Sequence, residues 1–389
     1  MLTEHFHNTQ KDTGHYSNDL RYVLSLQNTI AAFEEIKTWE GYAKTPLHSL
    51  DSLASDIGVK NIYYKDESSR FGLGSFKALG GTYGVLKFIH HALKKEIGDE
   101  VSMKDIHAGK YSEQISKYTV TTATDGNHGR SVAFGAKLFG CKCQIYIHSE
   151  VSSGRQKAME DLEATVNRIS GNYDASLQIC IEDAGKNNWH VISDTSYEGY
   201  TKYPRYIMAG YNVMAEEIID QIKDRPLPTH VFLQGGVGSF PGAICGYFWE
   251  KFPGNNIKFV VVESEHAPCL IRSAQNNQMT SVSIKQETMM AGLSCGEPSL
   301  LGWEILKSGT DDFITINDSS IPGLMRLLAK NNLKIEAGES SVAGLAGLIE
   351  SMADQKIAKA MGLNKESIVL LFGTEGATDP DIYRSIISE

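Results

Sequence analysis

Lys77 stands in an unusual setting within the stretch SSRFGLGSFKALGGTYG, which spans residues 68–84. A lysine that only faces solvent needs no glycine-rich surroundings. Glycine adds no side-chain bulk, so it lets the backbone come close to a bound molecule. A lysine amine held in this way can bond covalently to a carbonyl group. A helix start whose small residues serve packing is the alternative, and this stretch alone does not decide between the two.

A second candidate loop, TDGNHGRSVA at residues 124–133, follows a predicted strand and opens a predicted helix. Gly126 and Gly129 enclose Asn127 and His128. Glycine-spaced amides at the start of a helix form a binding site for anions. A plain strand-to-helix turn would use the same turn and cap residues but does not explain the two glycines.

A third loop, LQGGVGSFPG at residues 233–242, also joins a predicted strand to a predicted helix. Its segment 235–239 can present several backbone N–H groups and one hydroxyl to a phosphate. A dinucleotide fingerprint needs a third glycine where Pro241 stands, although Glu263 could still act as the ribose-binding acid. No Gly-Lys-Ser/Thr follows, which excludes a mononucleotide P-loop. A phosphate without an attached nucleotide fits best.

A fourth segment, LLFGTEGATDP at residues 370–380, is a predicted strand that ends at Gly373 and Thr374. A lysine, a phosphate-binding loop, an asparagine loop and a hydroxyl at a strand end together indicate pyridoxal phosphate. This cofactor needs an amine for its aldehyde, amides for its phosphate, and partners for its ring hydroxyl and ring nitrogen.

Strand-like runs alternate with amphipathic helical stretches along most of the chain. The predicted strands span residues 61–65, 118–124, 143–148, 164–170, 189–193, 229–234, 257–263 and 367–373. This alternation predicts an α/β protein with parallel sheets covered by helices on both faces. Ligands bind such sheets at the carboxyl ends of their strands, which is where the glycine loops lie. We expect residues 88–208 to form a small domain that carries the asparagine loop, inserted into a large cofactor-binding domain of residues 1–87 and 209–389.

Composition limits the possible partners. The chain has 389 residues and a net charge of −10, which argues against nucleic acid and favours a small-molecule ligand. The N-terminus is polar, and no apolar run reaches the roughly 18 residues that cross a membrane. The six cysteines are too sparse for a disulfide framework, and no metal site is expected. We expect a cytoplasmic protein.

From YAKTPLHSL at residue 42 to TEGATDP ending at residue 380, the chain resembles the tryptophan-synthase-like, or fold type II, pyridoxal-phosphate enzymes. Within them it is similar to the diaminopropionate ammonia-lyases. The resemblance rests on KDESSRFGLGSFKALGG, TDGNHGRSVA, DTSYEGY, QGGVGSF, MAGLSCGEPSLLGWEI, GESSVAGL and GTEGATD. It implies two open, twisted, mostly parallel sheets, each flanked by helices, in a homodimer that binds pyridoxal 5'-phosphate.

The resemblance also assigns roles to individual residues. It implies that Lys77 forms a Schiff base with the cofactor and that Asn127 meets the ring hydroxyl. Thr374 is the candidate partner for the pyridine nitrogen, with Glu339 as the alternative. The other implied cofactor-binding residues are Phe76 beside the lysine and the phosphate loop of Gly235, Gly236, Val237, Gly238 and Ser239.

Two acidic residues bear on the substrate. Asp125 stands where related dehydratases carry a serine, and Asp194 follows the last predicted strand of the small domain. Carboxylates near the lysine would attract a second substrate ammonium and supply the acid and base that its elimination needs. With the resemblance, they imply α,β-elimination of D- and L-2,3-diaminopropionate to pyruvate and ammonia, with Lys77, Asp125 and Asp194 catalytic.

Two alternatives remain open. A serine/threonine dehydratase or racemase on the same fold is favoured by Gly74 and Ser75, which precede the lysine in a dehydratase-like GSFK, and is disfavoured by Asp125. A nucleotide-binding regulatory protein, in which Lys77 is structural, belongs to another functional class.

Overall fold

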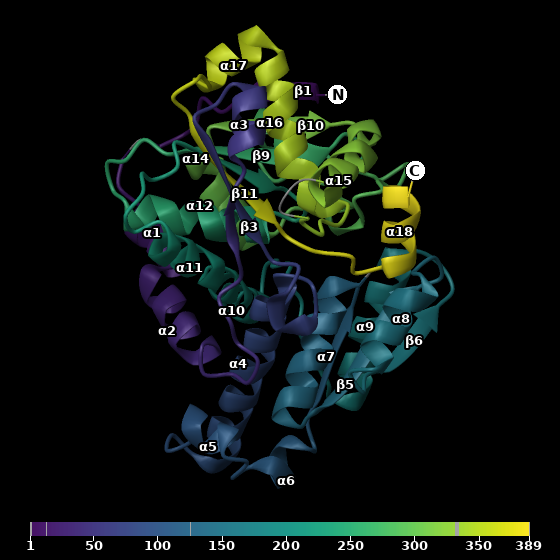
Figure 1. Ribbon diagram of the computed structural model, residues 1–389. Helices are drawn as coiled ribbons and strands as arrows, with labels where there is room; N and C mark the ends of the chain where they lie inside the picture. The colour runs from purple at the N-terminus through teal and green to yellow at the C-terminus, as the bar shows by residue number, and fades with distance from the viewer. Residues whose placement is uncertain (1, 13, 125, 331–333, 389) are drawn as a thin grey trace. The chain divides into compact units, whose positions relative to one another are not determined.

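The computed structural model describes residues 2–12, 14–124, 126–330 and 334–388 (Figure 1). The chain forms two compact units. The larger unit contains Met1–Phe76, Thr195–Gly199 and Tyr211–Glu389, and the smaller unit contains Lys77–Asp194 and Tyr200–Gly210. The first passage from one unit to the other therefore falls between Phe76 and Lys77.

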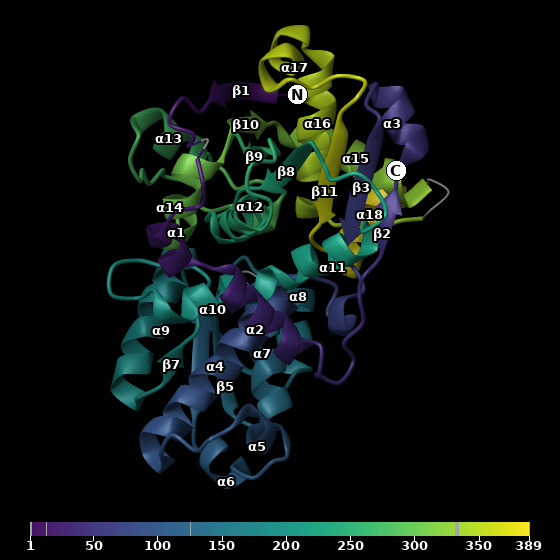
Figure 2. The same cartoon turned by 90° about the vertical axis from the view of Figure 1, so that its left-hand side faces the viewer.

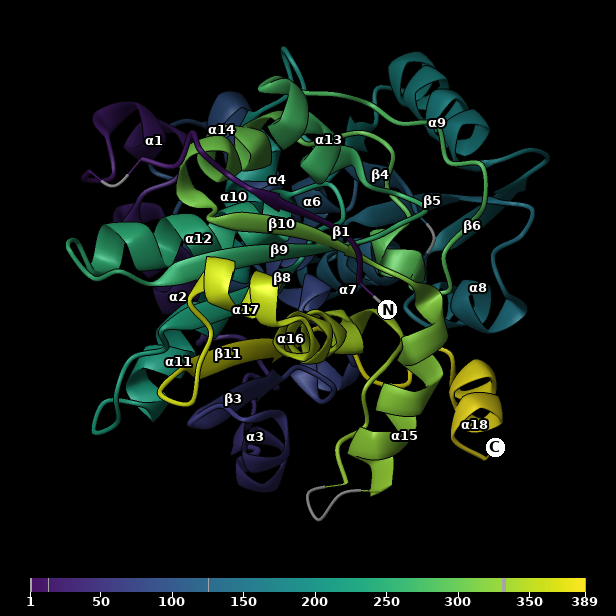
Figure 3. The same ribbon diagram turned by 90° about the horizontal axis from the view of Figure 1, so that it is seen from above.

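Within the described residues, the larger unit contains a seven-stranded sheet in the order β1-β10-β9-β8-β11-β3-β2 (Figure 2). The central strands from β10 to β3 pair in parallel, so their carboxyl ends lie along one edge of the sheet. β1 and β2 pair antiparallel at the two outer positions, and Figure 3 shows β1 running beside β10. The strands are β1 (Leu2–His7), β2 (Leu47–Ser49), β3 (Asn61–Asp66), β8 (His230–Gln234), β9 (Lys258–Ser264), β10 (Asp312–Ile316) and β11 (Ile368–Gly373).

Helices cover both faces of this sheet. Leu371 packs in the apolar core that includes α16, whereas the ring of its neighbour Phe372 lies 5.3 Å from that of Phe240 on α12. Successive strand residues point to opposite faces, so α16 and α12 lie on opposite sides of the sheet. The α-helices are α1 (Asn18–Val23), α2 (Leu26–Ile36), α3 (Asp51–Ile57), α11 (Val213–Gln221), α12 (Ser239–Lys251), α13 (Cys269–Asn276), α14 (Leu300–Gly309), α15 (Ile321–Lys330), α16 (Ala343–Ala353), α17 (Gln355–Met361) and α18 (Pro380–Ser388). Short 3₁₀ turns are η1 (Arg70–Gly72), η2 (Ala291–Leu293), η3 (Asp318–Ser320) and η4 (Ser340–Val342).

The smaller unit contains a parallel sheet in the order β6-β5-β4-β7. Its strands are β4 (Thr119–Ala123), β5 (Lys142–His148), β6 (Thr165–Ile169) and β7 (His190–Val191). Its helices are α4 (Lys77–Ile97), α5 (Met103–His107), α6 (Ser112–Ile115), α7 (Asn127–Phe139), α8 (Ser153–Glu160), α9 (Tyr173–Asn187) and most of α10 (Lys202–Tyr211).

α4 and α7 pack closely because their contact is lined by small residues. A β-carbon on Gly81 would overlap the Ser131 hydroxyl oxygen and lie 2.9 Å from the Ser131 β-carbon. The Thr82 hydroxyl donates a hydrogen bond of 3.0 Å to the carbonyl oxygen of Ser131. The glycines that follow Lys77 therefore serve helix packing, so part of the packing alternative for this stretch is correct.

The predicted α/β class with mostly parallel, helix-flanked sheets is confirmed. All the predicted strands are present, whereas β1, β2 and β10 were not predicted. None of the helices in the described ranges combines the length and apolarity that crossing a membrane requires.

Candidate active site

Lys77 is the first residue of α4 and the first residue of the smaller unit. Its ammonium group donates a hydrogen bond to Oδ2 of Asp194 and forms an ion pair with it. The two side chains are 22% and 14% exposed, so the pair is shielded but still accessible to a small molecule. The structure thus brings together two of the three predicted catalytic residues. The third, Asp125, lies outside the described residues.

The loop that carries Asp194 is fixed in place by its own unit. It follows β7, and the Tyr200 hydroxyl makes two hydrogen bonds to the backbone that leads into it. That hydroxyl donates to the carbonyl oxygen of Val191 at 2.9 Å and accepts from the N–H of Ser193 at 3.0 Å. Asp194 is therefore held by the backbone bonds of the residues just before it.

His128 lies near the ion pair of Lys77 and Asp194. It is buried on α7, and its Nε2 lies 2.8 Å from the carbonyl oxygen of Ile192. Its Nδ1 lies 3.9 Å from Oδ2 of Asp194. Burial lowers the pKa of His128 below its usual value, and the Lys77 charge acts in the same direction, whereas Asp194 opposes the shift. Its position between two loop glycines is the one signal in the sequence, and that signal assigns no role to the histidine. Asn127, beside it, is the half-buried first residue of α7.

The predicted phosphate loop joins β8 to α12 in the larger unit. Gly236 and Gly238 have φ of +54° and +95°, in the left-handed region that favours glycine. A β-carbon on Gly235 would lie 2.6 Å from Cγ of Glu263. In the part of the chain that the structure describes, the backbone N–H groups of Gly236 and Val237 have no hydrogen-bond acceptor. Such amides at the start of a long helix fit a phosphate group.

Glu263 is not available to bind a ribose. Its carboxylate is fully buried and accepts the backbone N–H groups of Leu270 at 2.8 Å and Ile271 at 2.7 Å, at the start of α13. Burial raises the pKa of Glu263 to about 8, although the two backbone hydrogen bonds oppose this shift. The dinucleotide alternative loses the acid on which it depended.

Thr374 directly follows β11, and its carbonyl oxygen accepts the N–H of Phe76 at 3.1 Å. Within the described ranges, the Thr374 hydroxyl makes no hydrogen bond, so it can still meet a ligand atom. The ring of Phe76 lies 4.7 Å from that of Tyr211 and 4.8 Å from that of Phe240. Phe76 therefore packs in an aromatic cluster directly before the lysine.

A side-chain hydrogen bond connects the carboxyl ends of β8 and β11. The Gln234 amide donates to the carbonyl oxygens of Phe372 at 2.6 Å and Ser341 at 3.2 Å. Glu339 lies buried just before η4, on the same segment as Ser341. The glycine loop, Thr374 and Glu339 therefore gather at one edge of the larger sheet.

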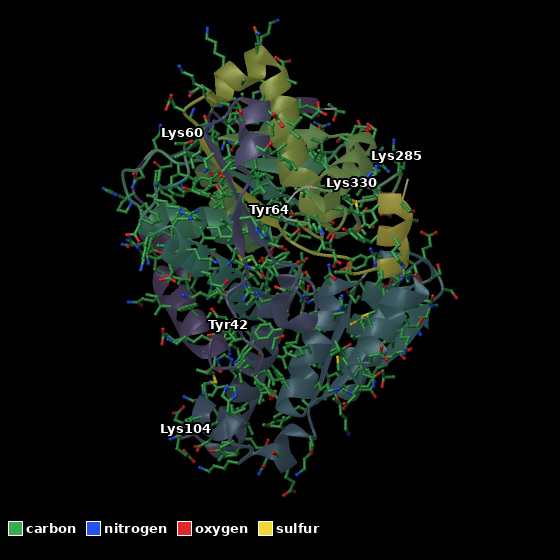
Figure 4. The ribbon with its side chains drawn as sticks, in the orientation of Figure 1. Tyr42, Lys60, Tyr64, Lys104, Lys285 and Lys330 are labelled. Atoms are coloured by element: carbon green, nitrogen blue, oxygen red, sulfur yellow. The ribbon has the colours of Figure 1, made fainter. Side chains whose placement is uncertain are left out.

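A buried ionic cluster of Lys65, Glu67, Arg70 and Glu217 supports the segment that leads to Phe76. Arg70 bonds Glu67 at 2.7 Å and Glu217 at 2.8 Å, and Lys65 bonds Glu217 at 2.7 Å. Burial alone would raise the pKa of Glu217, but hydrogen bonds and charges from Arg70 and Lys65 lower it to about 2. Figure 4 labels Tyr64, the neighbour of Lys65 on β3, which is also fully buried. This cluster was not predicted from the sequence.

The chain is similar to known pyridoxal-phosphate-dependent enzymes. A family model described as "Pyridoxal-phosphate dependent enzyme" matches residues 38–373. The diaminopropionate ammonia-lyase of Escherichia coli strain K12 is 38% identical over 357 residues, which cover 90% of this chain and 88% of that protein. The diaminopropionate ammonia-lyase of Salmonella typhimurium is 37% identical over 379 residues, 94% of each chain.

Solved structures show the same relationship. The crystal structure of the Escherichia coli diaminopropionate ammonia lyase in complex with an aminoacrylate-PLP azomethine reaction intermediate matches with a TM-score of 0.88 and 34% identity, covering 100% of this chain and 97% of that one. Among the relatives found by sequence, a probable D-serine dehydratase of Geobacillus stearothermophilus is more distant, at 24% identity over 86% of this chain and 76% of that protein.

Proposed function

Since the chain belongs to the family of pyridoxal-phosphate-dependent enzymes, we propose that it is a diaminopropionate ammonia-lyase. This enzyme converts 2,3-diaminopropionate and water to pyruvate and two molecules of ammonia. The observation that carries the proposal is the ion pair between Lys77 and Asp194. A carboxylate beside the amine suits a substrate that brings a second ammonium group.

The residues that would hold pyridoxal phosphate are those predicted from the sequence. Lys77 would bond its aldehyde carbon, Asn127 its ring hydroxyl, and Thr374 or Glu339 its ring nitrogen. The N–H groups of Gly236 and Val237, which have no acceptor among the described residues, and the left-handed Gly236 and Gly238 support a phosphate site in this loop. Phe76 would support the lysine from its aromatic cluster. When bound, the cofactor withdraws electrons from the substrate and stabilises the negative charge that develops at Cα.

The chain's own side chains would move the protons. The Cα proton must be removed, and the β-amino group is a good leaving group only when protonated. The hydrogen bond from Lys77 to Asp194 supports proton exchange within this pair, which would serve the L isomer. We assign Asp125 as the base for the D isomer, because a second base is needed to reach the opposite face.

The alternative is a serine/threonine dehydratase or racemase on the same fold. It is supported by the GSFK sequence before the lysine and by the distant similarity to a probable D-serine dehydratase. A hydroxyl substrate would gain less from an acidic site than a diamine would. The diaminopropionate assignment is therefore favoured.

The proposal extends to the organisation of the protein. The family resemblance supports a cytoplasmic homodimer. It also supports a division of roles between a large cofactor-binding domain, residues 1–87 and 209–389, and a small domain, residues 88–208, that carries the asparagine loop.

Incubation of the purified protein with 2,3-diaminopropionate tests the proposal. Pyruvate and ammonia should form with two ammonia molecules for each pyruvate. The protein should also show a visible absorbance band that borohydride bleaches, and Lys77→Ala should remove both signals while the fold is kept. A colourless protein that releases no pyruvate would contradict the assignment.

A further inference from the structure

We propose that His128 is a positioning residue that allows Asp194 to hold the proton given up by the Lys77 ammonium group. The role in turnover rests on the proposed function, whereas the geometry belongs to the smaller unit alone. Lys77, Asp194 and His128 come from the start of α4, the loop after β7 and the first turn of α7, respectively.

The tautomer of His128 follows from its partner. Nε2 lies 2.8 Å from the carbonyl oxygen of Ile192, and a carbonyl can only accept, so Nε2 carries the hydrogen. In the neutral ring, Nδ1 then has a lone pair. Among the described residues this buried Nδ1 has no hydrogen-bond partner. An unsatisfied buried acceptor is destabilising, so a proton donor facing Nδ1 would be favoured.

The group that faces Nδ1 is the carboxylate of Asp194. The distance of 3.9 Å from Nδ1 to Oδ2 exceeds a hydrogen bond, which measures about 2.8–3.0 Å. Two acceptors repel one another while Asp194 is ionised. Once the carboxyl group carries a proton, it becomes a donor to Nδ1, and a movement of about 1 Å closes the bond. His128 thus stabilises the protonated form of Asp194 over the ionised form.

The charges around the ring are consistent with this role. Among the described residues, the charged groups that act on His128 are Asp194 and Lys77, and burial keeps the imidazole neutral by lowering its pKa. A neutral ring can accept the hydrogen bond, whereas a protonated ring would donate to the carboxylate and hold it ionised.

The proton step balances within the cluster. An N–H bond of Lys77 breaks and an O–H bond of Asp194 forms, so the ammonium and carboxylate become an amine and a carboxylic acid. The Lys77 amine then carries the lone pair that attack on a carbonyl requires. His128 favours the neutral pair by accepting the new hydrogen bond, without exchanging a proton itself.

Two variants separate this role from a purely structural one. In His128→Gln the longer side chain places an amide N–H near the Nε2 position, so it keeps the bond to Ile192 and removes the acceptor at Nδ1. In His128→Asn the shorter side chain places an amide oxygen near the Nδ1 position, so it keeps an acceptor and loses the bond to Ile192. If His128 is only structural, His128→Gln should be the milder change. If Nδ1 accepts a hydrogen bond from Asp194, His128→Asn should disturb the proton transfer less than His128→Gln.

The readout is the pH dependence of trace acetylation of Lys77 in the full-length protein freed of cofactor, quantified by mass spectrometry. We expect the midpoint to rise by about one pH unit, a tenfold loss of neutral amine, in His128→Gln. His128→Asn should stay closer to the wild type. A folded His128→Gln variant with the wild-type labelling midpoint would overturn the proposal. A midpoint that rises more in His128→Asn than in His128→Gln would also overturn it.

The same variants give a second readout in the cofactor-loaded enzyme. The pH profile of kcat on 2,3-diaminopropionate should shift in His128→Gln in the same direction as the labelling midpoint, and an unshifted profile would contradict the proposal. Labelling requires no turnover, so it tests His128 even if the substrate is wrong. A wild-type protein that labels as expected but yields no pyruvate would refute the proposed function alone.

Discussion

Lys77 donates a hydrogen bond to Asp194 although 117 positions separate the two residues along the chain. Because Asp194 is placed to exchange a proton with the lysine, Asp194→Asn should lower kcat on 2,3-diaminopropionate by about 10²- to 10⁴-fold. A partly exposed ion pair contributes only about 1 kcal/mol to stability, so the melting temperature should change by a few degrees at most. Kinetics and thermal unfolding on one preparation check both statements. Unchanged turnover would remove Asp194 from the proton chemistry.

Gly81→Ala should disturb the start of α4, which carries Lys77. The new β-carbon would overlap the Ser131 hydroxyl, and such overpacking costs about 1–3 kcal/mol. Denaturant unfolding measures the loss. Gly185→Ala is the matched control, because Gly185 is also helical and in the same unit but has no atom within 4 Å of the added carbon. That control should be neutral or stabilising by about 0.5–1 kcal/mol, and equal losses in both variants would refute the packing argument.

Gly238→Ala should weaken cofactor binding. Gly238 has φ of +95° at the start of α12, where the phosphate loop presents its amides. Gly254→Ala provides a control, since Gly254 has φ of +84° in the same unit but no neighbour within 4 Å. Both variants incur similar backbone strain of about 1–2 kcal/mol, but only Gly238→Ala should raise the Kd for pyridoxal phosphate. Titration of each variant freed of cofactor, followed by absorbance, measures that Kd. Wild-type affinity in Gly238→Ala would argue against the loop as the phosphate site.

Glu217→Gln should destabilise the protein by about 3–5 kcal/mol, because it leaves buried Lys65 and Arg70 with too little negative charge. The folded-state pKa of Glu217, about 2, lies below the unfolded value of 4.5. Its contribution is therefore fully present above about pH 4.5 and is lost as the pH falls towards about 2.

The measurement for this variant is the free energy of unfolding in denaturant across that pH range. The wild type should lose more stability than Glu217→Gln as the pH falls. Glu34→Gln, which breaks an exposed pair with Lys37, should cost no more than about 1 kcal/mol. Parallel pH curves for the wild type and Glu217→Gln would show that folding does not lower the pKa of Glu217.

Much of the fold could be predicted because its strands are apolar runs with glycine loops at their ends. β10, with the sequence DFITI, was missed although it is buried throughout. It is short and begins at Asp312, whose carboxylate bonds His5 at 2.8 Å and His7 at 3.0 Å on β1. His5 and Asp312 are 307 positions apart, so a local sequence pattern does not record the pairing of these two strands.

In the candidate site, too, some features could be predicted from local sequence and others depend on distant residues. Lys77 and the glycine loops were visible because glycine and strand ends mark ligand sites locally. The neutral tautomer of His128 was not, because it depends on burial and on the carbonyl of Ile192, 64 positions away. The partnership of Arg70 with Glu217 likewise joins residues 147 positions apart, although Arg70 and Glu67 have helix-like spacing.

The ratio of kcat/KM on 2,3-diaminopropionate to kcat/KM on D-serine, measured with one preparation, distinguishes an ammonia-lyase from a dehydratase. An acidic site beside Lys77 should favour the substrate with the second ammonium group, and we predict a ratio of about 10² or more. The same variants of Lys77 and Asp194 should abolish or weaken both activities. A ratio of about one or less would rule out the ammonia-lyase assignment and identify the chain as a dehydratase.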